Sequence, residues 1–253
     1  RQDYTNYEVI VIENNSTEEA TFEYYKKIEQ EFDCLKVVYW DAEFNYSKIN
    51  NFGVKYATGE YLLLLNNDTE MIGTDCLSEL LSYGQRPDVG IVGAKLLYED
   101  DTVQHAGVIM GFGGLAGHAF VNNSKDDGGY QFRANLPQNL SAVTAACLLT
   151  RREVYEEVGG LEETLQVAFN DVELCYHIHD LGYVNVVRND VTLIHHESLS
   201  RGADDSVAKL KRLHQELDRL YELHPALYNK DPYYHRYLVK DVLDAEFFAG
   251  NRY

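Results

Sequence analysis

The sequence predicts an α/β fold with a mostly parallel central sheet flanked by helices. Three short apolar runs, at residues 8–12, 36–39 and 61–65, have the composition of buried strands. Helix-like segments at residues 18–32 and 47–57 separate these runs. Strands that alternate with helices at this spacing are joined by right-handed crossovers, so the first third of the chain is expected to build a parallel sheet.

Polar residues mark the ends of these helices. Ser16 or Thr17 can cap the first helix, because a side-chain oxygen there accepts a free N–H of the first turn. Gly59 ends the second helix, as glycine often does. A third helix is expected to start from a cap at Thr74 or Asp75.

The second half of the chain returns to the sheet at residues 89–97. Residues 102–140 are rich in Gly and Asn, and no regular element can be assigned to them. The remaining expected elements are a strand at 142–150, a helix stopped by Gly159 and Gly160, a helix at 171–181, a strand pair at 183–188 and 191–196, and an amphipathic helix at 204–223.

The composition is that of a globular protein with a strongly acidic surface. The chain has 253 residues, of which 45% are hydrophobic, and its apolar runs are far shorter than the ~20 residues that cross a bilayer. A formal net charge of −19 argues against a nucleic-acid partner, which would need a basic face. An anionic substrate must therefore be bound by a metal, by helix N-termini or by a few basic side chains.

The cysteines and the first residues indicate the cellular compartment of the protein and its relation to a longer chain. The four cysteines are widely spaced, which indicates free thiols in a reducing, cytoplasmic compartment. No signal peptide is visible, and the opening Arg1-Gln2-Asp3, without a starting Met, indicates a fragment of a longer polypeptide.

The apolar run at residues 61–65 ends abruptly in Asn66, Asn67 and Asp68. Open α/β sheets place ligand chemistry at the carboxyl ends of their strands. Hard divalent cations prefer oxygen ligands, so an ion at this triplet could hold the phosphates of a substrate. Asn and Asp also begin ordinary turns, and the triplet taken alone favours such a turn.

Two further polar clusters lie at element boundaries. Asp171 begins a helix, and His195 and His196 follow the last strand, shortly before Ser200 and Arg201. Each has a simple structural explanation: Asp171 as a helix cap, the histidines as solvated strand-end residues, and the last pair as a plain loop.

Taken together and in order, these segments resemble the family 2 glycosyltransferases of the GT-A fold, in the branch that makes bacterial surface polysaccharides. The likeness covers about residues 7–240. The matching segments are Glu13-Asn14-Asn15-Ser16, residues 44–53, Asn66-Asn67-Asp68 at the position of the family's aspartate-x-aspartate metal motif, residues 93–98, residues 103–107, residues 141–147, residues 170–174 and residues 195–198.

The resemblance implies an inverting transfer of a sugar from a nucleotide-diphosphate donor to a hydroxyl of a glycan or lipid-linked acceptor. The branch points to rhamnosyltransferases, working in the cytoplasm or at the inner face of the plasma membrane. A divalent ion, Mn²⁺ or Mg²⁺, would stabilise the diphosphate leaving group. Asp171 would be the general base that takes the acceptor proton.

Metal and donor residues also follow from the resemblance. Asp68 is the anionic member of its triplet, and His195 matches the family's single histidine; His196 stays open, because adjacent strand residues point to opposite faces. A histidine ligand favours Mn²⁺. The donor-binding positions are Glu13 and Asn14 near the nucleobase, Asn45, Lys48, Asn51 and Asn67, and Ser200 and Arg201 at the diphosphate. Lys48 equally fits a solvated helix face.

Two departures from the family pattern alter these expectations. Asn66 stands where the family has Asp, which lowers the charge and the expected metal affinity. The family's first strand should also precede Tyr7, so we expect a truncated sheet and an impaired site. Rearrangement or another chain, as in a homodimer, could fill the vacant position. The full-length protein could associate peripherally with a membrane.

The expected organisation is one GT-A domain with a C-terminal extension. Residues 1–100 form the nucleotide-sugar-binding half, 101–203 the acceptor-binding and catalytic half, and 204–253 a helix and tail. Acceptor selectivity is expected to lie in residues 102–140. The alternative is a non-catalytic sugar-nucleotide-binding or scaffold domain of a larger synthase; a nucleotidyltransferase, which shares the sheet, is a weaker third reading.

Overall fold

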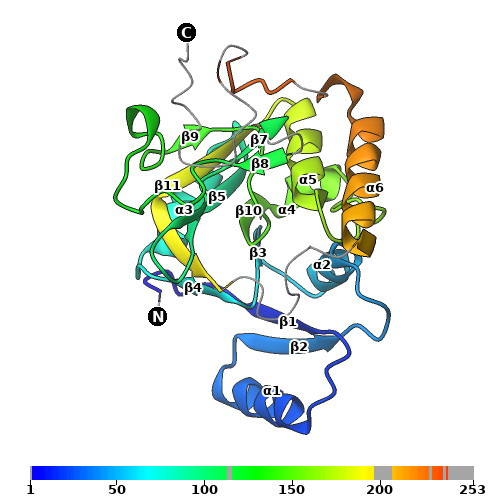
Figure 1. The fold of residues 1–253 in the computed structure, drawn as a ribbon. Helices are drawn as coiled ribbons and strands as arrows, with labels where there is room; N and C mark the ends of the chain where they lie inside the picture. Colours follow the sequence, from blue (N-terminus) through cyan, green and yellow to red (C-terminus); the bar gives the residue numbers. More distant parts are fainter. Residues whose placement is uncertain (1, 113–115, 197–206, 228–229, 236–237, 239–253) are drawn as a thin grey trace.

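A seven-stranded sheet lies at the centre of the molecule, with helices on both faces (Figure 1). The computed structural model describes residues 2–112, 116–196, 207–227, 230–235 and 238. The strands of the sheet are β3 (Tyr61–Leu65), β4 (Thr69–Met71), β5 (Val89–Leu97), β6 (Val103–His105), β9 (Gln138–Asn139), β10 (Cys147–Arg151) and β11 (Val184–His195). Their order is β3-β10-β5-β11-β4, with β6 paired to β5 and β9 to β11.

The predicted α/β class is confirmed, but the central sheet is mixed and not mostly parallel. The long pair β5–β11 is parallel, whereas β10 runs antiparallel between β3 and β5. The described part of the connection from β5 to β10 holds short strands and a 3₁₀ turn, η2 (Tyr130–Phe132), in place of a crossover helix. The chain therefore enters β10 from the edge at which β5 ended, and this makes β10 antiparallel.

The first two strands form a separate small sheet. β1 (Val9–Glu13) and β2 (Leu35–Tyr39) are parallel and joined by α1 (Glu19–Glu31), as predicted; they lie at the bottom of Figure 1. Among the described strands, β1 pairs with β2 alone, and β3 pairs with β10 alone. Packing of β1 on α2 (Tyr46–Val54) is close, because a Cβ added at Gly53 would clash with Ile12 Cδ1.

The predicted cap of α1 is wrong. Glu18 occupies the N-cap position without a side-chain bond, because the N–H and hydroxyl of Ser16 both donate to the Glu13 carboxylate. Asp75 occupies the N-cap position of α3 (Cys76–Gly84), as predicted, but its side chain makes no cap hydrogen bond. The N-terminal segment supplies one instead: Gln2 Oε1 accepts the N–H of Leu77 at 3.1 Å.

The predicted strand pair after residue 182 is one continuous strand, β11, with an irregularity in its middle. The register with β5 shifts between Arg188 and Thr192, so the intervening residues bulge out of the ladder. The buried guanidinium of Arg188 binds Asp190 through two hydrogen bonds and also binds Glu79. The two predicted strands are therefore the two halves of one strand that is interrupted by this bulge.

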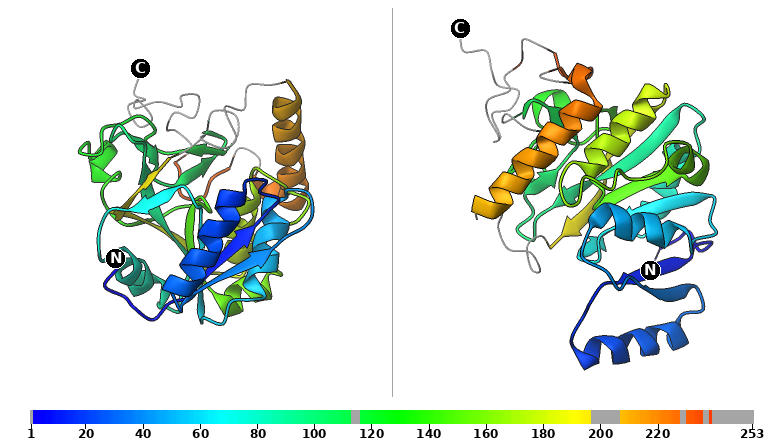
Figure 2. Two further views of the ribbon diagram at one scale, coloured as in Figure 1. Left: turned by 90° about the horizontal axis from the view of Figure 1, so that it is seen from below. Right: turned by 90° about the vertical axis from the view of Figure 1, so that its right-hand side faces the viewer.

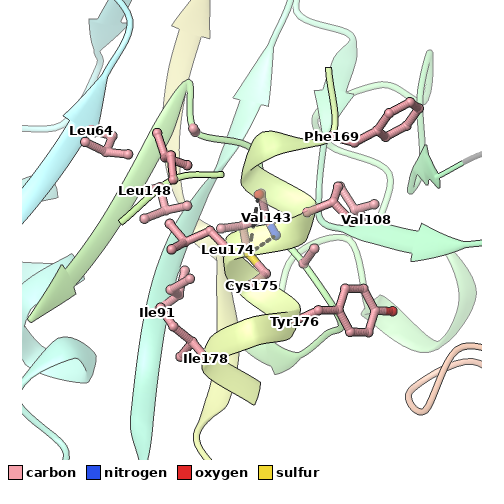
Figure 3. Close-up of a cluster of buried hydrophobic side chains, with 14 of the residues drawn as sticks. Leu64, Ile91, Val108, Val143, Leu148, Phe169, Leu174, Cys175, Tyr176 and Ile178 are labelled. Carbon is pink, nitrogen blue, oxygen red and sulfur yellow. Dashed lines mark hydrogen bonds between the residues drawn. The ribbon is translucent and has the colours of Figure 1, made fainter. Parts of the chain in front are cut away.

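Two hydrophobic layers hold the helices to the sheet. On one face, α5 (Asn170–Asp180) packs Leu174 and Ile178 against Leu148 and Ile91, as Figure 3 shows. α4 (Arg152–Glu157) contributes to the same layer, and Leu80 of α3 lies at the centre of the layer on the other face. A third group of buried hydrophobic side chains lies around β6, β7 (Val108–Met110) and β8 (Ala116–His118).

The four cysteines are free thiols, as predicted; Cys34 is exposed and the other three are buried. None of the helices that the structure describes has the length and apolar composition needed to cross a membrane.

The last long helix, α6 (Val207–Leu223), lies beside α5 in both Figure 1 and Figure 2. It holds the loop that leads into α5 through one buried carboxylate. Glu216 accepts the consecutive backbone N–H groups of Gln166, Val167 and Ala168 at 3.0, 3.2 and 2.7 Å. Phe169 follows in the left-handed conformation, with φ 61°, so α6 fixes the chain at the point where α5 begins.

We expect Glu216→Ala to lower the free energy of unfolding by about 3 kcal/mol, because three buried N–H groups lose a charged acceptor. Urea denaturation measures the change. Asp218→Ala is the matched control, since Asp218 is exposed on the same helix and should change stability by less than about 0.5 kcal/mol. Equal losses in the two variants would refute the anchoring role of Glu216.

Candidate active site

A pocket of about 170 Å³ lies where β3 and β11 end. Its walls come from the start of α2, the turn after β3, β6, β8, the loop before β10, the start of α5 and the last residue of β11. The lining residues are Tyr46, Asn66, Gln104, His118, Thr144, Ala145, Ala146, Val167, Asn170, Asp171 and His195.

Strand pairing brings Asp68 to His195, which lines this pocket, although Asp68 is not itself among the lining residues. The turn after β3 is closed by Thr69, whose hydroxyl donates to the carbonyl of Asn66 at 2.7 Å. β4 then pairs antiparallel with the end of β11, which puts Thr69 opposite His195. In consequence, Asp68 Oδ1 lies 3.1 Å from His195 Nε2, and the Asp68 carbonyl accepts the N–H of His196.

The two histidines point to different surroundings, as alternation along a strand requires. The His195 side chain is 11% exposed, with Nδ1 2.7 Å from Gln104 Oε1 and Nε2 3.3 Å from Asn66 Nδ2. His196 binds the carboxylate of Glu99 through Nδ1, and this hydrogen bond raises the pKa of His196. His195 is therefore the histidine that faces Asp68 and the pocket.

Asp171 lies in the first turn of α5 and faces the same pocket. The N-cap position belongs to Phe169, so the structure does not use Asp171 as the cap. Its Oδ2 accepts the N–H of Ala145 at 3.0 Å, and its Oδ1 accepts the N–H of Val172 at 2.8 Å. Both bonds fix the direction in which the carboxylate points.

Several pocket residues carried little sequence signal. Asn170 is 3% exposed, and its Nδ2 has no hydrogen-bond partner among the described residues, so it can donate to a substrate oxygen. Its place beside Asp171 in the 170–174 motif could have identified it. His118 and Gln104 come from the segment that the sequence left unassigned, and only the 103–107 match pointed to Gln104.

His105 lies behind the pocket and is neutral. Complete burial, and then the neighbouring His118 and His195, hold the pKa of His105 well below its usual value. Its ring meets that of His118 edge to face at 4.7 Å, and its Nε2 accepts the N–H of Thr144 at 3.4 Å. The His105 ring thus supports the pocket wall from behind.

Glu13 and Asn14 hold the small sheet together. The Glu13 carboxylate accepts hydrogen bonds from Ser16 and from the hydroxyl of Tyr25. Burial acts to raise the pKa of Glu13, but these hydrogen bonds together outweigh it. The pKa of Glu13 is therefore lowered, and the carboxylate stays ionised. Asn14 Nδ2 donates to the carbonyls of Trp40 and Ala42, which ties the end of β1 to the chain beyond β2.

Asn45 and Asn51 bind the loop before α5 and do not line the pocket. Asn45 caps α2 and donates to the carbonyl of Glu163; Asn51 donates to the carbonyl of Leu161 and accepts its N–H. The structure thus uses both to dock α2.

The other predicted donor residues have no described contact in the pocket. The side chains of Lys48 and Asn67 are exposed. Ser200 and Arg201 lie outside the described residues.

Asp68 and His195 fit a divalent cation that binds together with its substrate. The carboxylate oxygen and the imidazole nitrogen are 3.1 Å apart and suit Mn²⁺ or Mg²⁺. Within the described part of the chain, no set of three or more His, Cys, Asp or Glu side chains could hold a metal ion. Phosphate oxygens and water would have to supply the other ligands, as is usual for ions that bind phosphates.

Residues 1–159, more than half of the chain, match the profile described as Glycosyl transferase family 2. The chain belongs to this family. The match covers β1 to β10, together with the turn that carries Asp68.

Two relatives share nearly half of their aligned residues with this family 2 chain. It is 46% identical over 216 residues, 85% of its length, to the uncharacterized protein y4gI of Sinorhizobium fredii (strain NBRC 101917 / NGR234). It is 45% identical over 203 residues, 79% of its length, to the O-antigen biosynthesis protein RfbC of Myxococcus xanthus. The alignments span 24% and 16% of those proteins, so the chain corresponds to a small part of each.

The fold is that of GT-A glycosyltransferases. The mannosyltransferase PcManGT from Pyrobaculum calidifontis, solved with GDP-Man and Mn²⁺, superposes with a TM-score of 0.61. The alignment covers 87% of this chain and 56% of that one, at 19% identity. The fold class expected from the sequence is therefore confirmed.

The geometry predicts that His195, and not His196, contributes to metal binding. With a nucleoside diphosphate present, His195→Gln should weaken Mn²⁺ binding by about 10-fold or more, since an inner ligand is lost. His196→Gln should change the affinity by less than about 2-fold, because its ring binds Glu99. Electron paramagnetic resonance of free Mn²⁺ measures both, and the reverse order would contradict the assignment.

Proposed function

We propose that this family 2 chain is the catalytic domain of a metal-assisted, inverting glycosyltransferase. It would transfer a sugar from a nucleotide-diphosphate donor to a hydroxyl of a glycan or lipid-linked acceptor in bacterial polysaccharide synthesis. The observation that carries the proposal is that one pocket is lined both by His195, whose ring contacts the carboxylate of Asp68, and by a separate carboxylate, Asp171. The O-antigen role in the name of the Myxococcus relative supports the pathway.

Asp68 and His195 would hold the divalent cation. Mn²⁺, present with GDP-Man in the PcManGT structure, is the first candidate, and Mg²⁺ the second. When bound, the ion would stabilise the negative charge that develops on the diphosphate leaving group. In a protein with a net charge of −19, such local neutralisation is needed for an anionic donor to bind.

Asp171 would act as the general base. Its carboxylate is aimed by backbone N–H groups from Ala145 and Val172, and it lines the same pocket as His195. As the acceptor oxygen attacks the anomeric carbon, the proton would pass to Asp171. The donor's glycosidic bond to phosphate breaks in the same step, so attack opposite to the leaving group inverts the anomeric configuration.

Each half of the fold would bind one of the two substrates. Residues 1–100 would bind the nucleotide sugar, and residues 101–203 would bind the acceptor and carry the base, with 204–253 as an extension. His118, from the segment expected to select the acceptor, lines the pocket and supports this division. We place the reaction in the cytoplasm, at the inner face of the plasma membrane.

Asp171→Asn should lower the rate of sugar transfer by about 10²- to 10⁴-fold, since an amide cannot accept the proton, while donor affinity stays unchanged. Turnover is measured with the intact protein, Mn²⁺ and an acceptor extract. Asp180→Asn, at the exposed end of the same helix, is the control and should keep the wild-type rate. Equal rates in all three proteins would refute the base assignment.

Donor-dependent thermal stabilisation would identify the substrate. We expect one nucleotide sugar to raise the melting temperature only when Mn²⁺ is present, because the ion links the phosphates to Asp68 and His195. Stabilisation without turnover under any condition would favour the alternative, a non-catalytic sugar-nucleotide-binding domain of a larger synthase. Stabilisation that does not depend on metal would contradict the proposed metal assistance.

A further inference from the structure

Gln104 holds His195 from two sides. Gln104 lies in β6 and is 4% exposed. It belongs to the matching segment 103–107, to which the family resemblance assigned no role. Its Oε1 is 2.7 Å from His195 Nδ1, and its Nε2 donates to the His195 carbonyl at 3.5 Å. One side chain therefore contacts both the ring and the backbone of the histidine that faces Asp68.

The second contact decides how the amide is oriented. A backbone carbonyl only accepts hydrogen bonds, so the NH₂ group of Gln104 faces it and Oε1 faces the ring. An amide oxygen also only accepts, so the proton between Oε1 and the ring belongs to His195 Nδ1. The short Nδ1–Oε1 distance fits an N–H donor and a carbonyl acceptor.

The other nitrogen of the ring is then left with a lone pair. Asn66 Nδ2, 3.3 Å from His195 Nε2, can donate to this lone pair and favours the same form of the ring. Asp68 favours the opposite form, because its carboxylate, 3.1 Å away, would accept a proton from Nε2. Gln104 and Asn66, which are neutral, thus favour a proton on Nδ1, whereas the charged Asp68 favours a proton on Nε2. A metal ion at Nε2 needs the form with the proton on Nδ1.

We propose that Gln104 is a positioning residue that keeps the proton of neutral His195 on Nδ1 and leaves Nε2 free for the metal ion. The proposal rests on the function proposed above and deepens it by naming the residue behind the histidine ligand. Without Gln104, Asp68 draws the proton to Nε2, and a metal ion must displace it. A neutral amide performs this selection without adding a further charge to the acidic site.

His118 provides an internal control. Its Nδ1 lies 3.3 Å from the main-chain carbonyl of Gln104, which also requires a proton on Nδ1. A substitution at position 104 removes the side chain and keeps this carbonyl. The proton of His195 should therefore move in such a variant, whereas that of His118 should stay.

Nuclear magnetic resonance of protein labelled with ¹⁵N-histidine tests the proposal without metal or substrate. In alkaline buffer, where the rings are neutral, long-range ¹H–¹⁵N spectra should show His195 protonated on Nδ1. In Gln104→Met the proton should move to Nε2, with His118 unchanged; the His195→Gln spectrum assigns the signals. Wild-type His195 protonated on Nε2, or an unchanged form in the variant, would overturn the proposal.

Mn²⁺ binding in the presence of a nucleoside diphosphate gives the second readout. Gln104→Met should weaken binding by about 10- to 100-fold, the usual effect of removing a partner behind a histidine ligand. Gln104→Glu keeps an acceptor for the Nδ1 proton and should restore most of the affinity. Gln85→Met, on the exposed end of α3, should bind as the wild type does, and melting temperatures confirm that each variant is folded.

These results separate two kinds of failure. Equal Mn²⁺ affinity in wild type and Gln104→Met, or no recovery in Gln104→Glu, would contradict the positioning role. Absence of Mn²⁺ binding by the wild-type protein would contradict the proposed metal-assisted function, whichever nitrogen of His195 carries the proton.

Discussion

The antiparallel pairing of β4 with the last residues of β11 is the contact on which the candidate site depends. It joins two segments that are far apart in the chain and puts Thr69 opposite His195. Because the turn after β3 ends at Thr69, the carboxylate of Asp68 is delivered to the ring of His195. β11 reaches this position because its long parallel pairing with β5 anchors it through the centre of the sheet, past the bulge after Arg188.

Helix α5 depends on a second constraint, which acts on its first turn. Glu216 holds the backbone before Phe169, and the backbone N–H of Ala145 binds the side chain of Asp171. Asp171 is thus fixed by α6 on one side and by the loop before β10 on the other. Both carboxylates, that of buried Glu216 and that of partly buried Asp171, accept hydrogen bonds from backbone N–H groups.

The expected donor residues show how a sequence motif can combine structural and chemical roles. Asn14, Asn45 and Asn51 each use their amide groups to bind backbone atoms of other segments. Their places in the family pattern are therefore explained by packing, whatever else they contact. The pocket instead gains polar groups from Asn170 and from Gln104 and His118, because β6 and β8 fold over it.

The sequence by itself predicted the long helices and most long strands of the α/β fold, but not the short strands β4 and β6 to β9, and it singled out Asp68, Asp171 and the His195–His196 pair as candidate site residues. Alternating apolar strands and helices carry that information locally, since each element needs only its own periodicity and flanking polar residues. The side-chain cap bonds expected of Ser16 and Asp75 do not form, because nearby side chains offered better partners or the N-terminal segment took over the role.

Only the tertiary structure decided between His195 and His196, made β10 antiparallel, and gave Gln104 its place behind the site. Each of these results depends on which strands pair and in what register, and such pairings join residues too far apart in the chain for local patterns to specify.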